Sequence, residues 1–131
     1  MDAVLFLGTE IRVKRRVRKW ANCPRCGQRC RQHSTSRRRL RELGLHHPVA
    51  LEVVQSVHHC GKCHRHFKLP IDELAESGSR FTRAVKEKAL ASVFEDGLPI
   101  QSVVQRMLRD FNVHVPPSTL YDWMAEAGGK S

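Results

Sequence analysis

Two short stretches decide the fold of this chain: Cys23-Pro24-Arg25-Cys26-Gly27 and Cys60-Gly61-Lys62-Cys63. In each stretch two residues separate the cysteines, so both sulfurs of a turn can face one centre, and the glycines allow tight backbone there. Brought together, the two turns offer four thiolates, a ligand set that suits tetrahedral Zn²⁺. A shell closed by four sulfurs leaves no position for water. The sequence therefore predicts one structural zinc ion bound by Cys23, Cys26, Cys60 and Cys63.

Other candidate ligands surround these pairs. Cys30 lies outside the paired spacing, so we expect it to be a free thiol. Imidazole also binds zinc well, and four histidines flank the second pair of cysteines: His58, His59, His64 and His66. We expect these histidines at the surface or in contact with phosphate. Replacement of one cysteine ligand by a histidine or by Cys30 stays open.

The charge of the chain is divided unequally along its length. Residues 1–70 hold 16 Lys and Arg against 4 Asp and Glu, or +12, whereas residues 71–131 hold 7 against 9, or −2, which gives the net charge of +10. Such asymmetry predicts a polyanionic partner for the cysteine-bearing half. We expect double-stranded DNA.

The beginning of the chain bears on its location. The apolar run within residues 1–7 is too short for a secretion signal or a membrane span. Without a secretion signal, five cysteines favour thiolates in a reducing compartment over disulfides. We therefore expect a cytoplasmic, nucleoid-associated protein without a membrane partner.

Period-two patterns predict β structure over residues 10–69. Residues 11–18 alternate between a half-buried face, Ile11, Val13, Arg15 and Val17, and an outward cationic face, Arg12, Lys14, Arg16 and Arg18. Residues 51–57 alternate in the same way, and residues 39–43 are expected to pair with them through Gly44 and Pro48 in a hairpin. Short strands that lead into two cysteine turns predict a zinc ribbon, here with an extended hairpin.

Beyond the ribbon the pattern changes to that of helices. Residues 70–80 are rich in Pro, Gly and Ser and predict a linker. Three amphipathic stripes follow: Phe81, Val85, Ala89 and Val93, then Val103, Val104, Met107, Leu108 and Phe111, then Leu120, Trp123, Met124 and Ala127. The last two helices are joined by a tight turn, as in a helix-turn-helix. We expect an α+β protein with a zinc-ribbon domain (1–69), a linker (70–80) and a helix-turn-helix domain (81–131).

Two groups of residues are candidates for DNA contacts. Guanidinium groups can grip phosphates without reading sequence, and we assign this role to the basic residues of the ribbon: Arg12, Lys14, Arg16, Arg18, Arg37, Arg38, Arg39 and Arg41. Base reading is better assigned to the start of the third helix, with Ser118, Thr119, Tyr121 and Asp122. That helix also holds Glu126 and no cation within residues 117–129, which opposes a DNA backbone and keeps a protein-docking role open. No motif gathers a catalytic set, and we expect no enzymatic activity.

The order of parts resembles a known family. A basic strand, a CPxCG turn, a hairpin, a second CxxC and the segment GLPIQSVVQRMLRDFNVHVPPSTLYDWM are similar to the N-terminal region of bacterial insertion-sequence transposases, over about residues 11–128. The stretch from Pro117 to Trp123 looks like the recognition-helix pattern of those enzymes. In that family the zinc and helix-turn-helix modules bind terminal inverted repeats, and an RNase-H-like domain that follows them performs the strand transfer.

The resemblance ends where that catalytic domain would begin, so it implies only the binding role. It implies zinc ligation by the four paired cysteines and a DNA-facing third helix. We expect the terminal-repeat-binding part of a transposase, or a truncated or domesticated remnant, with a homo-oligomer or a separate catalytic subunit as further partners. The alternative is an RNA- or ribonucleoprotein-binding zinc ribbon whose helices dock a protein.

Overall fold

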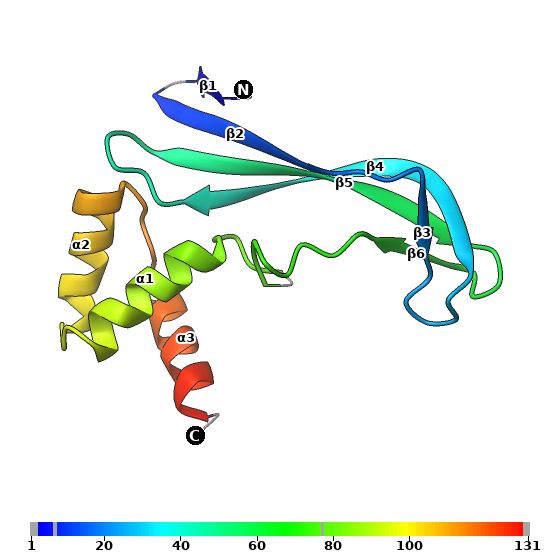
Figure 1. Cartoon of the computed structure of the whole chain (residues 1–131). Coiled ribbons are helices and arrows are strands. Elements are labelled where there is room, and N and C mark those ends of the chain that lie inside the picture. Colours follow the sequence, from blue (N-terminus) through cyan, green and yellow to red (C-terminus); the bar gives the residue numbers. More distant parts are fainter. Residues whose placement is uncertain (1–2, 7, 77, 130–131) are drawn as a thin grey trace.

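The computed structural model describes residues 3–6, 8–76 and 78–129 (Figure 1). For residues 3–6 and Gly129 only the backbone is described. Residues 1–2 and 7 of the first expected domain, Ser77 of the expected linker and residues 130–131 of the second expected domain lie outside the described residues. The fold is α+β, a mixed six-stranded sheet with three helices, which confirms the predicted class.

The sheet has six strands, and β5 pairs with three of the others. Their bounds are β1 Ala3–Phe6, β2 Thr9–Arg16, β3 Trp20–Asn22, β4 Arg29–Glu42, β5 Val49–Cys60 and β6 Arg65–Lys68. The strand order is β1-β2-β5-β4-β3, with β6 also pairing β5. β2 runs parallel to β5, and the other pairs are antiparallel.

The predicted hairpin is confirmed as the long pair β4 and β5. Leu40 lies opposite Leu51, and the pairing continues from Glu42 and Val49 to Gln32 and His58. A register shift between Gln32 and Ser34 interrupts it near the cysteine end. Such a bulge bends the strand that carries it and increases the local twist.

The predicted alternation of β2 holds only in part. From Ile11 to Lys14 apolar residues are half-buried and basic residues exposed, but Arg15 is exposed and Arg16 half-buried. The strand ends at Arg16, so Val17 and Arg18 lie beyond it. The register also places Arg12 beside Leu51 and Lys14 beside Val53. Arg12 and Lys14 therefore lie on the same side of the sheet as the buried side chains Leu51 and Val53 of β5, although they are themselves exposed.

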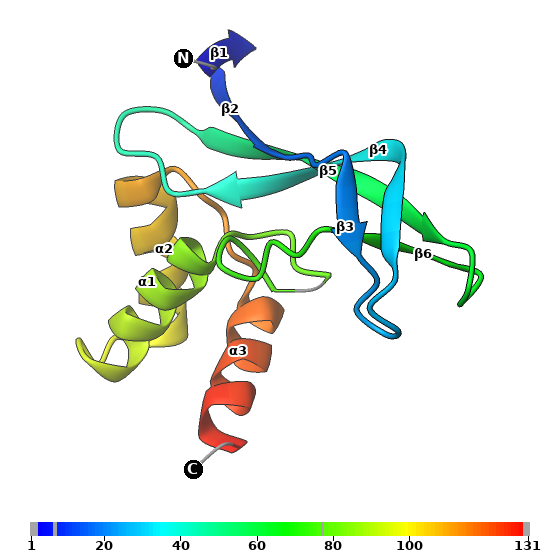
Figure 2. The same cartoon turned by 45° about the vertical axis from the view of Figure 1, so that its right-hand side comes forward.

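All three helices lie on one side of the sheet (Figures 1 and 2). They are α1 Arg83–Phe94, α2 Ile100–Phe111 and α3 Pro117–Gly129. Gly97 has a φ of 66°, but α1 ends before it, at Phe94 with Glu95 as its C-cap. Leu108 departs from its predicted stripe, because its side chain is 52% exposed.

The helices share one apolar core. Its buried members come from all three predicted stripes and from the segments around them: Phe81, Val85, Ala89, Val103, Met107, Val113, Val115, Leu120 and Trp123. The rings of Phe81 and Trp123 meet edge to face, with centroids 5.5 Å apart. This contact joins the start of α1 to α3.

Residues 70–80 lie against the sheet. Ile71 and Ala75 are buried with Leu40, Leu51 and Val53. The backbone then forms a bridge between Arg41 and Phe81, with the Thr82 amide donating to the Arg41 carbonyl at 3.0 Å. The division into two domains at this segment stays a prediction. What the structure shows is a segment that joins the sheet to α1 by buried contacts.

A second set of hydrogen bonds joins the loop between β4 and β5 to the end of α2. The Gly44 amide, in the loop between β4 and β5, donates to the Phe111 carbonyl at 2.8 Å. The Asn112 side chain donates to the Gly44 carbonyl, also at 2.8 Å.

In the described part of the chain, no helix has the length and apolar character needed to cross a bilayer.

Candidate metal centre and cationic surfaces

Each pair of cysteines sits in the turn of a β-hairpin. The first turn, residues 23–28, joins β3 to β4, and the second, residues 61–64, joins β5 to β6. In the first turn the Gly27 amide donates to the Cys23 carbonyl at 2.8 Å, with Gly27 at a φ of 77°. The predicted need for glycine is met here, because only glycine adopts this conformation without strain.

In the second turn the left-handed residue is a histidine. His64 has a φ of 55°, whereas Gly61 does not have a positive φ. The sequence-based expectation that Gly61 supplies the tight backbone is therefore wrong. The two turns lie side by side at the end of the sheet far from the helices (Figures 1 and 2).

The four predicted thiols meet between these turns. The sulfurs of Cys23, Cys26, Cys60 and Cys63 all lie within 4.8 Å of one another. Cys26 and Cys60 are 3.5 Å apart, and Cys23 and Cys63 are 3.9 Å apart. A metal that holds four sulfurs tetrahedrally at about 2.3 Å separates them by about 3.8 Å. The cluster therefore has the dimensions to hold one metal ion.

Local hydrogen bonds lower the pKa of two of the thiols and raise that of a third. The backbone amide of Cys63 donates to the Cys60 sulfur at 3.3 Å and is the main cause that lowers the pKa of Cys60 to about 6. The amides of Cys26 and Arg25 likewise lower the pKa of Cys23. Hydrogen bonding to Cys26 and burial raise the pKa of Cys63 to about 12. A divalent ion at the centre would favour the thiolate at all four positions.

Cys30 packs against the thiol cluster, and His58 contacts Cys30. Cys30 is buried and donates its thiol to the Gln28 carbonyl at 3.2 Å, and burial raises its pKa. His58, expected at the surface, is instead fully buried. Its Nδ1 lies 3.1 Å from the Cys30 carbonyl, its Nε2 lies 2.8 Å from the Ser56 hydroxyl, and its ring stacks on Phe67. Burial with two polar partners makes His58 a structural residue rather than a phosphate contact.

The predicted phosphate-binding residues fall on both faces of the sheet. Arg37 and Arg39 lie on the outer face, the face without helices, together with Arg15 of β2. All three are exposed, and Arg37 and Arg39 share Glu52, each at 3.6 Å. Val54 lies between Arg15 and Arg37 and is buried, as expected where long arginine stems cover a small apolar side chain.

The other basic strand residues belong to the helix-bearing face or to chain segments beyond the strands. Arg16 binds Glu73 at 2.9 Å, and the Arg38 guanidinium donates to the carbonyls of Glu76 and Ser79. Both are half-buried and hold the segment after β6 in place. Arg12, which pairs with Glu10, Lys14 and Arg18 are exposed. The structure therefore separates the predicted contacts into two surfaces and gives two of them structural bonds.

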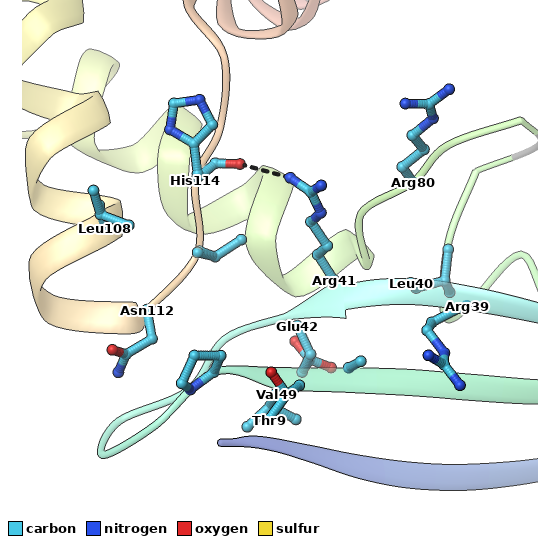
Figure 3. Close-up of a pocket in the computed structure, with 13 residues that line it drawn as sticks. Thr9, Arg39, Leu40, Arg41, Glu42, Val49, Arg80, Leu108, Asn112 and His114 are labelled. Atoms are coloured by element: carbon cyan, nitrogen blue, oxygen red, sulfur yellow. Dashed lines mark hydrogen bonds between the residues drawn. The ribbon is translucent and has the colours of Figure 1, made fainter. Parts of the chain in front are cut away.

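A cleft of about 590 Å³ lies where the sheet meets the helices (Figure 3). Its lining includes the basic side chains Arg39, Arg41 and Arg80 together with His114. Figure 3 shows Arg41 and Arg80 extending on the same side of β4 as His114, with Arg39 on the other side. Arg41 donates to the His114 carbonyl at 3.4 Å and lies over the Phe81 ring. Sequence reasoning placed Arg41 among the contacts but missed Arg80 and His114 as its neighbours.

The predicted reading residues occupy the first turns of α3. Ser118, Tyr121 and Asp122 are exposed, whereas Thr119 is half-buried. On the same helix Glu126 binds Lys86 of α1 at 2.8 Å, so part of the acidic charge of α3 is compensated. Burial by itself would lower the pKa of Lys86, but its bonds to Glu126 and Glu76 raise it.

No family model, curated protein or solved structure matches the chain. What the site does must follow from its own residues. Among them, the sequence located all four thiols by their spacing. It missed the inward direction of His58, although its place two residues before Cys60 on one strand was a usable signal.

Proposed function

We propose that this chain is a zinc-dependent DNA-binding protein, the terminal-repeat-binding part of an insertion-sequence transposase or a remnant of one. The observation that carries the proposal is the four-thiol cluster at the end of a strongly cationic sheet. Residues 1–70 hold an excess of 12 positive charges, and the arginines of the outer face are exposed.

Zinc is the metal we propose for the thiols. Four sulfurs with near-tetrahedral spacing suit zinc or iron, and a closed shell gives a structural site. The apolar cluster around the thiols is small: Cys23, Cys30 and Cys60, with Cys63 and Phe67 against it. Binding of structural zinc supplies about 10–16 kcal/mol. In this proposal the ion, more than apolar burial, holds the two turns together.

The outer face is the surface we propose for the DNA backbone. It is not covered by helices, and Arg15 of β2 and Arg37 and Arg39 of β4 project from it on either side of β5. Glu52 neutralises only part of this charge. Guanidinium groups on a rigid sheet can bind phosphates in a fixed arrangement without reading sequence.

Base reading is proposed for α2 and α3 as a helix-turn-helix. Five residues, 112–116, separate the two helices, and the accessible side chains near the start of α3 are Ser118, Tyr121 and Asp122. The helices lie on the opposite side of the sheet from the outer face. Phosphate binding and base reading would therefore use different sides of the molecule, and the test can separate them.

The test is a binding titration with zinc-loaded protein. Duplexes selected from a random library are compared with scrambled duplexes over a range of salt concentrations. Replacing Arg15, Arg37 and Arg39 with Ala should weaken binding to both duplexes and reduce the salt slope by about 1 for each phosphate that is no longer bound. The matched variant Arg12→Ala/Lys14→Ala tests the other face and should leave the slope nearly unchanged.

Replacing Tyr121 with Ala should instead reduce the preference for the selected duplex and leave the slope unchanged. Equal affinity for selected and scrambled duplexes at moderate salt would contradict sequence recognition. An unchanged slope in the triple arginine variant would remove the outer face from the interface.

RNA remains a second candidate because of one observation. Trp20 is 40% exposed, and the Arg29 guanidinium lies 4.9 Å from its ring centroid. An exposed aromatic ring beside a cation can stack on an unpaired base. Competition between structured RNA and duplex DNA for the same protein decides between the two, and a Trp20→Ala variant should weaken only RNA binding.

A further inference from the structure

Three exposed imidazoles meet on neighbouring strands near the thiol cluster. They belong to His33 of β4, His59 of β5 and His66 of β6. The ring centroids are 4.8 Å apart for His59 and His66, 5.1 Å for His33 and His66, and 6.4 Å for His33 and His59. The planes are tilted by 49–53° and do not stack.

This triad is distinct from the four thiols. His59 and His66 are directly opposite each other in the pairing of β5 and β6, so their side chains leave the same face. Cys60 and His58 are the neighbours of His59 on β5, and successive side chains of a strand point to opposite faces. The thiols, Cys30 and the His58–Phe67 stack therefore lie on one face, and the three exposed imidazoles on the other.

The spacing of the rings fits a shared ligand. A metal bound by three imidazole nitrogens at about 2.0–2.1 Å in tetrahedral directions holds the ring centroids about 5 Å apart. Two of the three separations have this value, and the third needs an approach of about 1 Å. Among the described residues the four thiols already converge, whereas the imidazole nitrogens need side-chain rotation, which exposure allows.

We infer that His33, His59 and His66 form a second metal site, which binds a borderline divalent transition-metal cation such as Zn²⁺, Ni²⁺ or Cu²⁺. Imidazole is a preferred ligand of these ions. Three protein ligands at an exposed surface leave at least one coordination position to water, so this ion exchanges with solvent more readily than one enclosed by four thiolates. The inference does not rest on the proposed DNA binding.

The test uses Ni²⁺ as the probe. The 131-residue chain, loaded with one equivalent of zinc, is titrated with Ni²⁺ by calorimetry, and its zinc content is measured before and after. We expect one Ni²⁺ per chain to be added without loss of zinc. Loss of a partner that only orients a metal ligand weakens metal binding about 10–100-fold, and loss of a ligand itself should cost no less. His33→Ala, His59→Ala and His66→Ala should each show such a weakening.

His64→Asn is the matched control. His64 is also exposed and lies between Cys63 and β6, and asparagine tolerates its left-handed backbone. This variant should bind Ni²⁺ as the unaltered chain does. The inference is overturned if no Ni²⁺ is added, if Ni²⁺ only displaces zinc, if His64→Asn weakens binding as much as the three triad variants, or if those variants bind normally.

Discussion

Replacing Cys60 with Ser tests the metal centre most directly. Cys60 is fully buried, ends β5, accepts the Cys63 amide and lies 3.5 Å from the Cys26 sulfur. A serine hydroxyl has a similar shape but remains protonated and is a poor zinc ligand. If four thiolates contribute equally to about 10–16 kcal/mol of binding, removal of one weakens zinc binding about 100- to 1,000-fold.

The helices should survive this change. Their apolar core, from Phe81 to Trp123, contains no residue of the cysteine turns. Far-ultraviolet circular dichroism should therefore keep most of its helical signal, while competition with a chromophoric chelator reports the loss of zinc affinity. Cooperative loss of the helical signal together with the metal would show that the helical core depends on the cysteine turns.

Cys30→Ser is the control for the same experiment. Cys30 is buried beside the cluster but is not one of its four members, and a serine can still donate to the Gln28 carbonyl. This variant should bind one zinc ion with nearly unchanged affinity. The four-ligand assignment is refuted if Cys30→Ser loses as much affinity as Cys60→Ser, or if Cys60→Ser loses none.

Five further variants test the helices by urea denaturation. Met107→Ala should cost about 2–5 kcal/mol because Met107 is fully buried, whereas Leu108→Ala on the exposed side of α2 should change stability by about 0.5 kcal/mol or less; equal costs would contradict this packing. Thr82→Ala should cost about 0.5–2 kcal/mol because the Thr82 hydroxyl caps α1 and donates to Glu42, and Thr82→Ser should restore most of the loss. Because the pKa of Lys86 is raised in the fold, the charged lysine stabilises the fold at pH values below its usual pKa of 10.5, and this stabilisation is lost as pH rises through the raised pKa. The Lys86→Met variant should therefore be less stable than the unaltered chain at neutral pH, and the difference in stability should shrink above pH 10.5. A difference independent of pH would refute the role of this charge.

Local patterns predicted the elements that depend on local chemistry. The spacing of the cysteines identified the four thiols that the structure brings together. The β4–β5 hairpin followed from alternation on both sides of Gly44 and Pro48. In each case the signal lies within a few residues of the feature it predicts.

Features set by distant partners could not be predicted in the same way. Alternation in β2 predicted that the strand has two different faces. It could not predict which face lies on the same side of the sheet as the buried residues of β5, because the parallel register joins residues far apart in sequence. Arg16 and Arg38 read as free cations, yet Glu73 and the carbonyls of Glu76 and Ser79 bind them. Burial of His58 likewise depends on Ser56 and on the Cys30 carbonyl of another strand.

The long hairpin has a consequence for assembly of the thiol centre. The first cysteine turn directly precedes β4, and the second directly follows β5. Strand pairing that starts at the short connection, residues 43–48, and extends along β4 and β5 therefore brings the two cysteine turns together. Much of the entropy cost of uniting distant ligands is thereby met before any ion arrives. A slip of one residue would turn Cys60 to the wrong face, so ion capture would also act as a proofreading step for strand alignment.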